Sequence, residues 1–190
     1  SIASSSFEQA GYSILWVTRS TLKSDVWKNI FDQICHSVIK HEVDNGLILP
    51  ETITARKKLL SRNWLEPMSY MQFSNLLIGK NKNYDILKTR NGTDDILKKT
   101  LVIIDEGHKL YGNDLKHTEK PNTDIMEKLI MNSYKKSKAD SCKLLIMTAT
   151  PFTNSPLELF KLTNLFMETE AEKIATEKNE FIKEYMSSDN

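Results

Sequence analysis

The 190-residue sequence has few cysteines, no long apolar run and almost no excess of charge. Its two cysteines, Cys35 and Cys142, cannot form a disulfide framework and suit a reducing compartment. Charged or amide side chains interrupt every apolar stretch before it reaches membrane-spanning length, so we expect no membrane partner. The 26 Lys and Arg residues nearly balance the 25 Asp and Glu residues. A net charge of +1 excludes a globally basic nucleic-acid clamp and a polyacidic tail, but it leaves room for a local basic groove.

The composition is that of an ordinary globular domain. Hydrophobic residues make up 39% and charged residues 27%, over a length typical of one domain. Such a chain can bury a sizeable hydrophobic core without disulfides or bound metal ions. The small-residue segment 1–6 reads as part of a helix rather than as a charged leader, and Gly11 would end that helix. We therefore expect an element upstream of Ser1.

The apolar pattern predicts alternating strands and helices. Short apolar runs predict strands at residues 13–18, 101–104 and 143–147, with a shorter one near 68–70. Helical spacing predicts helices over residues 26–39, 51–61, 123–136 and 157–167, and residues 80–99 read as an exposed insertion with one helical turn. This alternation indicates an α/β fold whose mostly parallel sheet carries helices on both faces. Chemistry in such sheets gathers at the carboxyl ends of the strands.

The predicted strand at 101–104 delivers two carboxylates into a turn. Asp105 and Glu106 are followed there by Gly107 and His108. Because Mg²⁺ prefers oxygen ligands and dehydrates reluctantly, the first carboxylate suits a metal bound through water. The second can polarise an attacking water. For the acidic pair alone, a solvated turn after a core strand is the alternative interpretation.

Two hydroxyls follow the predicted strand at 143–147. Thr148 and Thr150 flank Ala149 before Pro151, and by themselves they read as caps of a strand end. The acidic turn and these threonines lie about 40 residues apart, a typical spacing for a helical crossover plus a loop. Taken together at the strand ends of one sheet, the two motifs favour a functional site.

These residues resemble the motifs of a known family. Residues 102–108 (VIIDEGH) resemble the Walker B or DExH-box motif of superfamily-two helicases and translocases, and residues 145–151 (LIMTATP) resemble their motif III. Residues 17–22 (VTRSTL) fit motif Ia, and residues 68–70 (MSY) fit the motif Ib region more loosely. The run 150–159 is similar to the Swi/Snf-like branch, in which large DNA viruses carry poxvirus-type nucleoside triphosphatases and early-transcription-factor helicases.

The resemblance implies a RecA-like lobe with an incomplete P-loop NTPase fold. Residues 1–168 would form the first, ATP-binding lobe, and residues 169–190 a charged helical tail towards a second lobe of the same chain. The implied cofactors are ATP and Mg²⁺. Asp105 would bind Mg²⁺ through water, Glu106 would activate the attacking water, and His108 would complete the nucleotide site. Gly107 stands where the family more often has alanine, a change that the turn can survive with added backbone freedom.

The resemblance also implies a nucleic-acid partner. Thr18, Arg19 and Ser69 would approach backbone phosphates, of DNA rather than RNA, and the hydroxyls of Thr148 and Thr150 would meet His108 to couple hydrolysis to strand binding. For Arg19 a solvated strand-end cation is the alternative. The viral relatives extend the expected partners to transcription machinery, and the expected location is intracellular, in a virion or the host cytoplasm.

The phosphate loop of this family is missing from the sequence. No G-x-x-x-x-G-K-[ST] pattern occurs, because Ser74 replaces the first glycine before Gly79 and Asn81 replaces the hydroxyl after Lys80. Family order places the loop just upstream of Ser1, and the arginine finger belongs to the second lobe. Hydrolysis by these residues alone is therefore expected to be negligible. The alternative function is a catalytically silent RecA-like module that docks nucleic acid or a transcription factor.

Overall fold

In the computed structural model of the chain, the described residues are 2–29, 43–46, 48, 52, 55, 63–112, 115–151 and 155–186. They form the strands β1 (Ser13–Thr18), β2 (Met68–Ser69), β3 (Thr100–Asp105) and β4 (Lys143–Met147). The longer helices are α1 (Ile2–Gln9), α2 (Lys23–Asn29), α5 (Tyr70–Leu77), α6 (Asn83–Asn91), α7 (Thr123–Ser137) and α8 (Leu157–Asn164). Apart from residues 52 and 55, the predicted helix over 51–61 lies outside the described residues, and so does the part of the predicted helix over 26–39 that follows residue 29.

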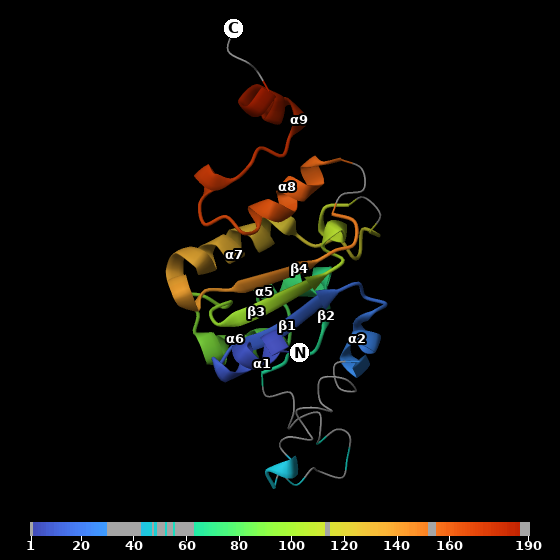
Figure 1. Cartoon of the computed structure of the whole chain (residues 1–190), viewed down its shortest axis with the longest axis vertical. Coiled ribbons are helices and arrows are strands. Elements are labelled where there is room, and N and C mark those ends of the chain that lie inside the picture. The colour runs from blue at the N-terminus through green and yellow to red at the C-terminus, as the bar shows by residue number, and fades with distance from the viewer. Residues whose placement is uncertain are drawn as a thin grey trace.

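The four strands form one parallel sheet in the order β2-β1-β3-β4 (Figure 1). The register pairs Val17 with Ile104 and Asp105 with Met147, so β1, β3 and β4 end at the same edge. The predicted strands are confirmed to within a residue or two at each end. The predicted α/β fold class, a parallel sheet between helices, is also confirmed.

Helices pack on both faces of the sheet because strand residues alternate between two apolar clusters. The larger cluster joins Leu15, Val17, Val102 and Ile104 to α5 and α7, through residues such as Phe73 and Ile130. The smaller cluster joins Ile14, Leu101 and Ile103 to Trp64, with Phe7 of α1 and Trp27 of α2 packed against it. Full burial of a large apolar side chain stabilises the fold by roughly 1.5–3 kcal/mol, so these alternating residues fix which side of each strand faces which helices.

Residues 80–99 differ from the exposed insertion that the sequence predicts. They contain α6, and the side chains of Leu87 and Leu97 are fully buried in the larger cluster. The buried carboxylate of Asp95 accepts hydrogen bonds from the hydroxyls of Ser133 and Ser137 on α7. The segment has too few apolar residues for a helical pattern, and its order comes from these long-range contacts.

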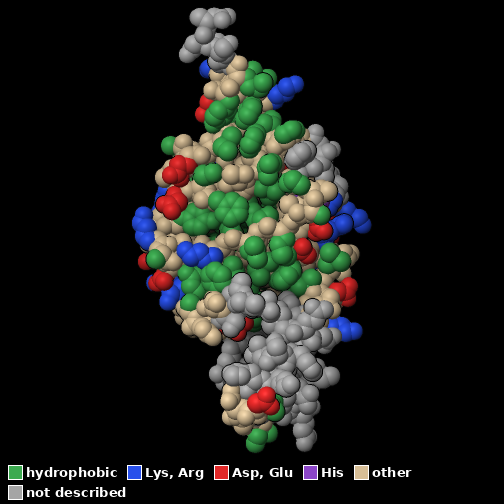
Figure 2. Space-filling view, viewed as in Figure 1, with side chains coloured by type: hydrophobic (Ala, Val, Ile, Leu, Met, Phe, Trp, Pro, Cys, Tyr) green, Lys and Arg blue, Asp and Glu red, His purple; other side chains and the backbone are tan. Residues whose placement is uncertain are grey.

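Strand β4 is the least covered part of the sheet. Within the described residues it pairs with β3 alone, and none of its five residues is fully buried. Leu145, which lies opposite Ile103, is 44% exposed. Figure 2 shows hydrophobic side chains gathered on the face of the molecule seen in this view. Among the described residues, the outer edge of β4 therefore has no strand partner, and this edge is called the open side of β4.

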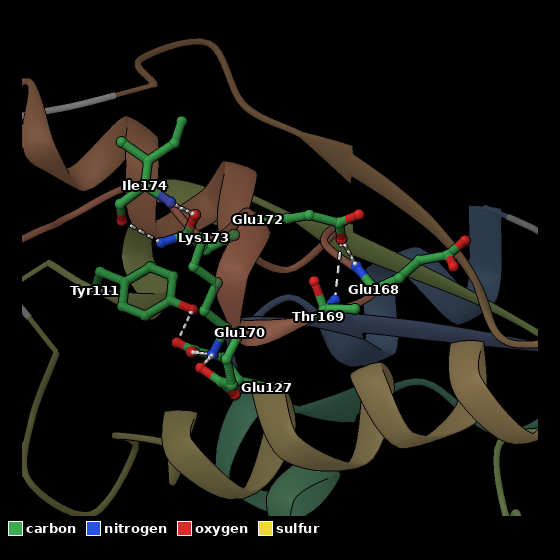
Figure 3. A network of polar contacts seen from close by, with 9 residues as sticks. Tyr111, Glu127, Glu168, Thr169, Glu170, Glu172, Lys173 and Ile174 are labelled. Atoms are coloured by element: carbon green, nitrogen blue, oxygen red, sulfur yellow. Dashed lines mark hydrogen bonds and ion pairs between the residues drawn. The ribbon is translucent and has the colours of Figure 1, made fainter.

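The sequence predicts a charged helical tail over residues 169–190, and the described part of this segment is divided into short helical pieces. It forms the short turns η4 (Glu170–Glu172), α9 (Lys178–Phe181) and η5 (Ile182–Met186). Phe181 stacks on Phe160 of α8, with ring centroids 5.2 Å apart. The side chain of Asn164 exchanges two hydrogen bonds with the backbone of Ile174, each 2.9 Å long (Figure 3).

Candidate functional site

The candidate site lies where β1, β3 and β4 end, because all three strands run in the same direction. Thr18 ends β1 and Asp105 ends β3. The buried Thr18 hydroxyl donates a hydrogen bond to Asp105 Oδ2 over 3.1 Å. The structure thus brings together one residue of the motif Ia candidate and one of the acidic turn, although they are far apart in sequence.

Glu106 occupies a strained backbone conformation directly after β3. Its φ of 52° and ψ of 47° lie in the left-handed region, which costs roughly 1–3 kcal/mol for a residue other than glycine. Its carbonyl accepts a hydrogen bond from the Lys109 amide at 2.9 Å, within the short helix η2 (Gly107–Leu110). The side chain of Glu106 is 40% exposed. A water molecule can therefore reach its carboxylate.

Gly107 is packed too closely for a side chain. A Cβ atom at this position would lie 2.4 Å from Cγ2 of Ile146 on β4. That distance is much shorter than two carbon atoms tolerate, so even alanine would force the Ile146 side chain, β4 or the turn to move. The sequence predicts only that the turn can survive a glycine here, whereas the close packing between the turn and the neighbouring strand accounts for its small size.

His108 is buried and reaches the end of β4. Its Nδ1 lies 2.7 Å from the Thr148 hydroxyl and 3.4 Å from Glu106 Oε2. The Thr148 hydroxyl also donates to the Thr150 carbonyl at 3.0 Å. Because a hydroxyl has a single proton, satisfying both contacts requires Nδ1 to carry a hydrogen and donate to Thr148. This tautomer also places a donor towards the Glu106 carboxylate.

The two threonines of the motif III candidate differ in what they contribute. Thr148 supplies its hydroxyl to His108. Thr150 supplies backbone groups, since its amide donates to Thr148 Oγ1 at 3.3 Å and its carbonyl accepts from the same hydroxyl. Thr150 therefore orients Thr148.

Ser69 lies beside Thr18 in the register of β2 and β1. Its hydroxyl accepts the Gln72 amide proton at 3.2 Å, while Gln72 Oε1 accepts from the Ser69 amide at 3.0 Å. This capping box begins α5. The hydroxyl of Ser69 is thus engaged in starting a helix at the edge of the site.

Arg19 follows Thr18 directly and is half-buried. Its Nε atom is buried without a hydrogen-bond partner in the described part of the chain. A buried guanidinium nitrogen left unpaired costs free energy until an acceptor reaches it. An oxygen-rich ligand is therefore the natural complement of Arg19.

Tyr70 is a further residue of the candidate site, which the sequence pattern did not indicate. Its hydroxyl donates to the Asp105 carbonyl at 2.7 Å and lies 3.3 Å from the Glu106 carbonyl. The side chain is almost completely buried. The motif Ib resemblance covers this position, but a sequence pattern carries no signal that this phenol reaches the acidic turn.

The oxygens of the site suit Mg²⁺ bound mainly through water and phosphate. Asp105, Glu106 and Thr18 offer carboxylate and hydroxyl oxygens, the ligand type that Mg²⁺ prefers. The described residues contain no group of three His, Cys, Asp or Glu side chains placed to form a protein cage for a metal.

None of the described helices combines the length and apolar composition needed to cross a bilayer. No known protein family matches this chain, and no curated protein matches its sequence.

Proposed function

We propose that this chain forms the ATP-binding lobe of an ATP-dependent helicase or translocase that acts on nucleic acid, DNA rather than RNA. The meeting of three strand ends at one edge carries the proposal: Thr18 bonds to Asp105, and His108 bonds to Thr148 across β3 and β4. A merely solvated acidic turn would not require a buried histidine bonded to the end of the next strand.

In this proposal the two carboxylates have different tasks. Bound Mg²⁺ would neutralise phosphate charge and polarise the phosphoryl group. Asp105 would bind it through water, with its carboxylate oriented by the Thr18 hydroxyl. Glu106, whose side chain is accessible to water, would orient or deprotonate the attacking water.

The same edge would contact the nucleic acid. Arg19 carries the unpaired Nε described above, and a guanidinium matches the geometry of phosphate oxygens. Thr18 and Ser69 are adjacent to it across β1 and β2. Contacts to phosphates are independent of base sequence, which suits a motor that moves along a strand. Transcription machinery and an intracellular location belong to the same proposal.

The proposal also requires a phosphate-binding loop and a second lobe. The open side of β4 supports it, because a strand carrying the loop could pair there and cover Leu145. The second lobe would supply the cation that stabilises the transition state.

The direct test is ATP hydrolysis by the whole protein, with and without DNA. We expect hydrolysis that depends on Mg²⁺ and increases with DNA, together with a Gly-Lys-Thr or Gly-Lys-Ser phosphate loop in the whole protein. DNA binding without nucleotide binding, and without such a loop, would instead identify a silent docking module.

A further inference from the structure

We propose that Tyr70 is a positioning residue that holds Glu106 in its left-handed conformation and connects it to the Ser69 end of β2. This inference rests on the proposed function of Glu106. The Tyr70 hydroxyl donates to the Asp105 carbonyl over 2.7 Å and lies 3.3 Å from the Glu106 carbonyl. It therefore contacts the peptide groups on both sides of the Glu106 Cα atom.

Those two peptide groups determine where the Glu106 carboxylate points. A left-handed residue other than glycine persists only where its surroundings fix the backbone, because the strain costs roughly 1–3 kcal/mol. The Lys109 amide fixes the Glu106 carbonyl from within η2. Tyr70 fixes the same turn from a different part of the fold. Loss of its hydroxyl would leave the turn freer to return to an ordinary conformation.

Tyr70 is itself held rigidly. It is the first residue of α5, directly after Ser69, whose capping box with Gln72 sets the start of the helix. The Lys23 ammonium of α2 donates to the same Gln72 side chain at 2.9 Å. With its ring buried in the larger cluster, Tyr70 has little freedom to move except with the end of β2.

The acidic turn is therefore held from two sides. His108 attaches it to the end of β4 through Thr148, and Tyr70 attaches it to the start of α5. Strand β1 lies between β2 and β3, so Tyr70 reaches past one strand to make its contact. A phosphate that displaced Ser69 would displace the adjacent Tyr70 and, through it, Glu106. This gives nucleic acid a route to the attacking water that does not pass through Thr148.

The variant that tests this role is Tyr70→Phe, with Tyr134→Phe as its matched control. The Tyr134 hydroxyl also donates to one backbone carbonyl, that of Leu165 at 3.1 Å, but it lies on α7 away from the turn. Tyr70→Phe removes a hydroxyl that contacts two carbonyls, and Tyr134→Phe removes one that donates to a single carbonyl, so both should lower the unfolding temperature. Amide hydrogen exchange over residues 105–110 and the kinetics of ATP hydrolysis are measured on the whole protein.

We expect Tyr70→Phe alone to accelerate exchange over residues 105–110 and to lower kcat about ten-fold in the presence of DNA, with KM for ATP unchanged. Unchanged exchange over these residues, or equal changes in exchange and kcat in the two variants, would overturn the proposal. If the wild-type protein hydrolyses no ATP and exchange still accelerates only in Tyr70→Phe, the proposed function fails while the positioning role of Tyr70 stands.

Discussion

The Nδ1 atom of His108 lies 2.7 Å from the hydroxyl of Thr148, and this contact joins the turn after β3 to the end of β4. The hydroxyl is oriented in turn by the backbone of Thr150. Because both partners lie beyond the strand ends, the contact can transmit a displacement of one strand end to the other. Its loss should thus affect coupling between sites more than the chemical step.

Thr148→Ala should uncouple hydrolysis from movement. In the proposed motor, basal ATP hydrolysis should change less than stimulation by DNA and translocation along it. His108→Ala should have the same effect, and the double variant should add little, since residues in one network are not additive. Thr148→Ser, which keeps the hydroxyl, and Thr150→Ala, which keeps the backbone groups, are the matched controls. An equal loss of stability and of all activities would show that Thr148 only caps the strand.

Glu106→Gln should slow turnover strongly and leave nucleotide binding largely intact. The amide keeps the size of the side chain but cannot accept the proton of the attacking water. We expect ATP hydrolysis in the whole protein to fall about 10²–10⁴-fold with nucleotide affinity largely intact. Glu66→Gln, at the exposed ion pair with Lys82, is the control. Turnover at the wild-type rate in Glu106→Gln would remove Glu106 from the catalytic role.

Gly107→Ala should destabilise the fold unless β4 makes room. The added Cβ would meet Ile146 Cγ2 at 2.4 Å, and overpacking of this kind costs about 1–3 kcal/mol. Combining Gly107→Ala with Ile146→Ala, which removes the clashing methyl group, should recover at least about 1 kcal/mol relative to the sum of the single changes. The free energy of unfolding of each variant is measured by urea denaturation. Leu144→Ala, two residues earlier on β4, is the control partner, and strictly additive free energies in both pairs would contradict the packing argument.

The ion pair between Lys173 and Glu127 should make stability depend on pH above 10. Burial lowers the pKa of Lys173, but its hydrogen bonds to Glu127 and Glu170 outweigh burial and raise the pKa above its ordinary value of 10.5. Burial, reinforced by Glu127, also raises the pKa of Tyr111, whose hydroxyl donates to that glutamate at 2.9 Å. Figure 3 shows the chain of contacts.

Both groups have a raised pKa in the folded state, so the stability they contribute is complete below pH 10 and is lost as pH rises further. Lys173→Met should therefore lower the free energy of unfolding by about 1 kcal/mol near pH 8. In this variant the free energy of unfolding should also decrease less steeply between pH 10 and 12 than in the wild type. Lys128→Met, an exposed change on α7, is the control. If the free energy of unfolding falls equally between pH 10 and 12 in Lys173→Met and in the wild type, this account is wrong.

The sequence predicted the strands of the sheet more accurately than the segments that pack around them. Apolar runs such as residues 13–18 and 101–104 lie in strands at or within a residue of those positions, because a buried parallel strand needs a continuous apolar stretch. The placement of Asp105, His108 and Thr148 at one edge followed from strand direction. The packing of α6 and the reach of Tyr70 depend on side chains that meet only after folding, and a local pattern does not encode such contacts.

The open side of β4 has a consequence for the behaviour of the protein in solution. Its outward backbone amides and carbonyls, next to the exposed Leu145, form a template on which the β4 of another copy can add as a strand. Lys143 is the one charged residue of β4, and its positive charge opposes the pairing of two copies along this edge. These 190 residues, produced alone at high concentration, are therefore expected to self-associate through β4, and a charge introduced at Leu145 should keep them dispersed.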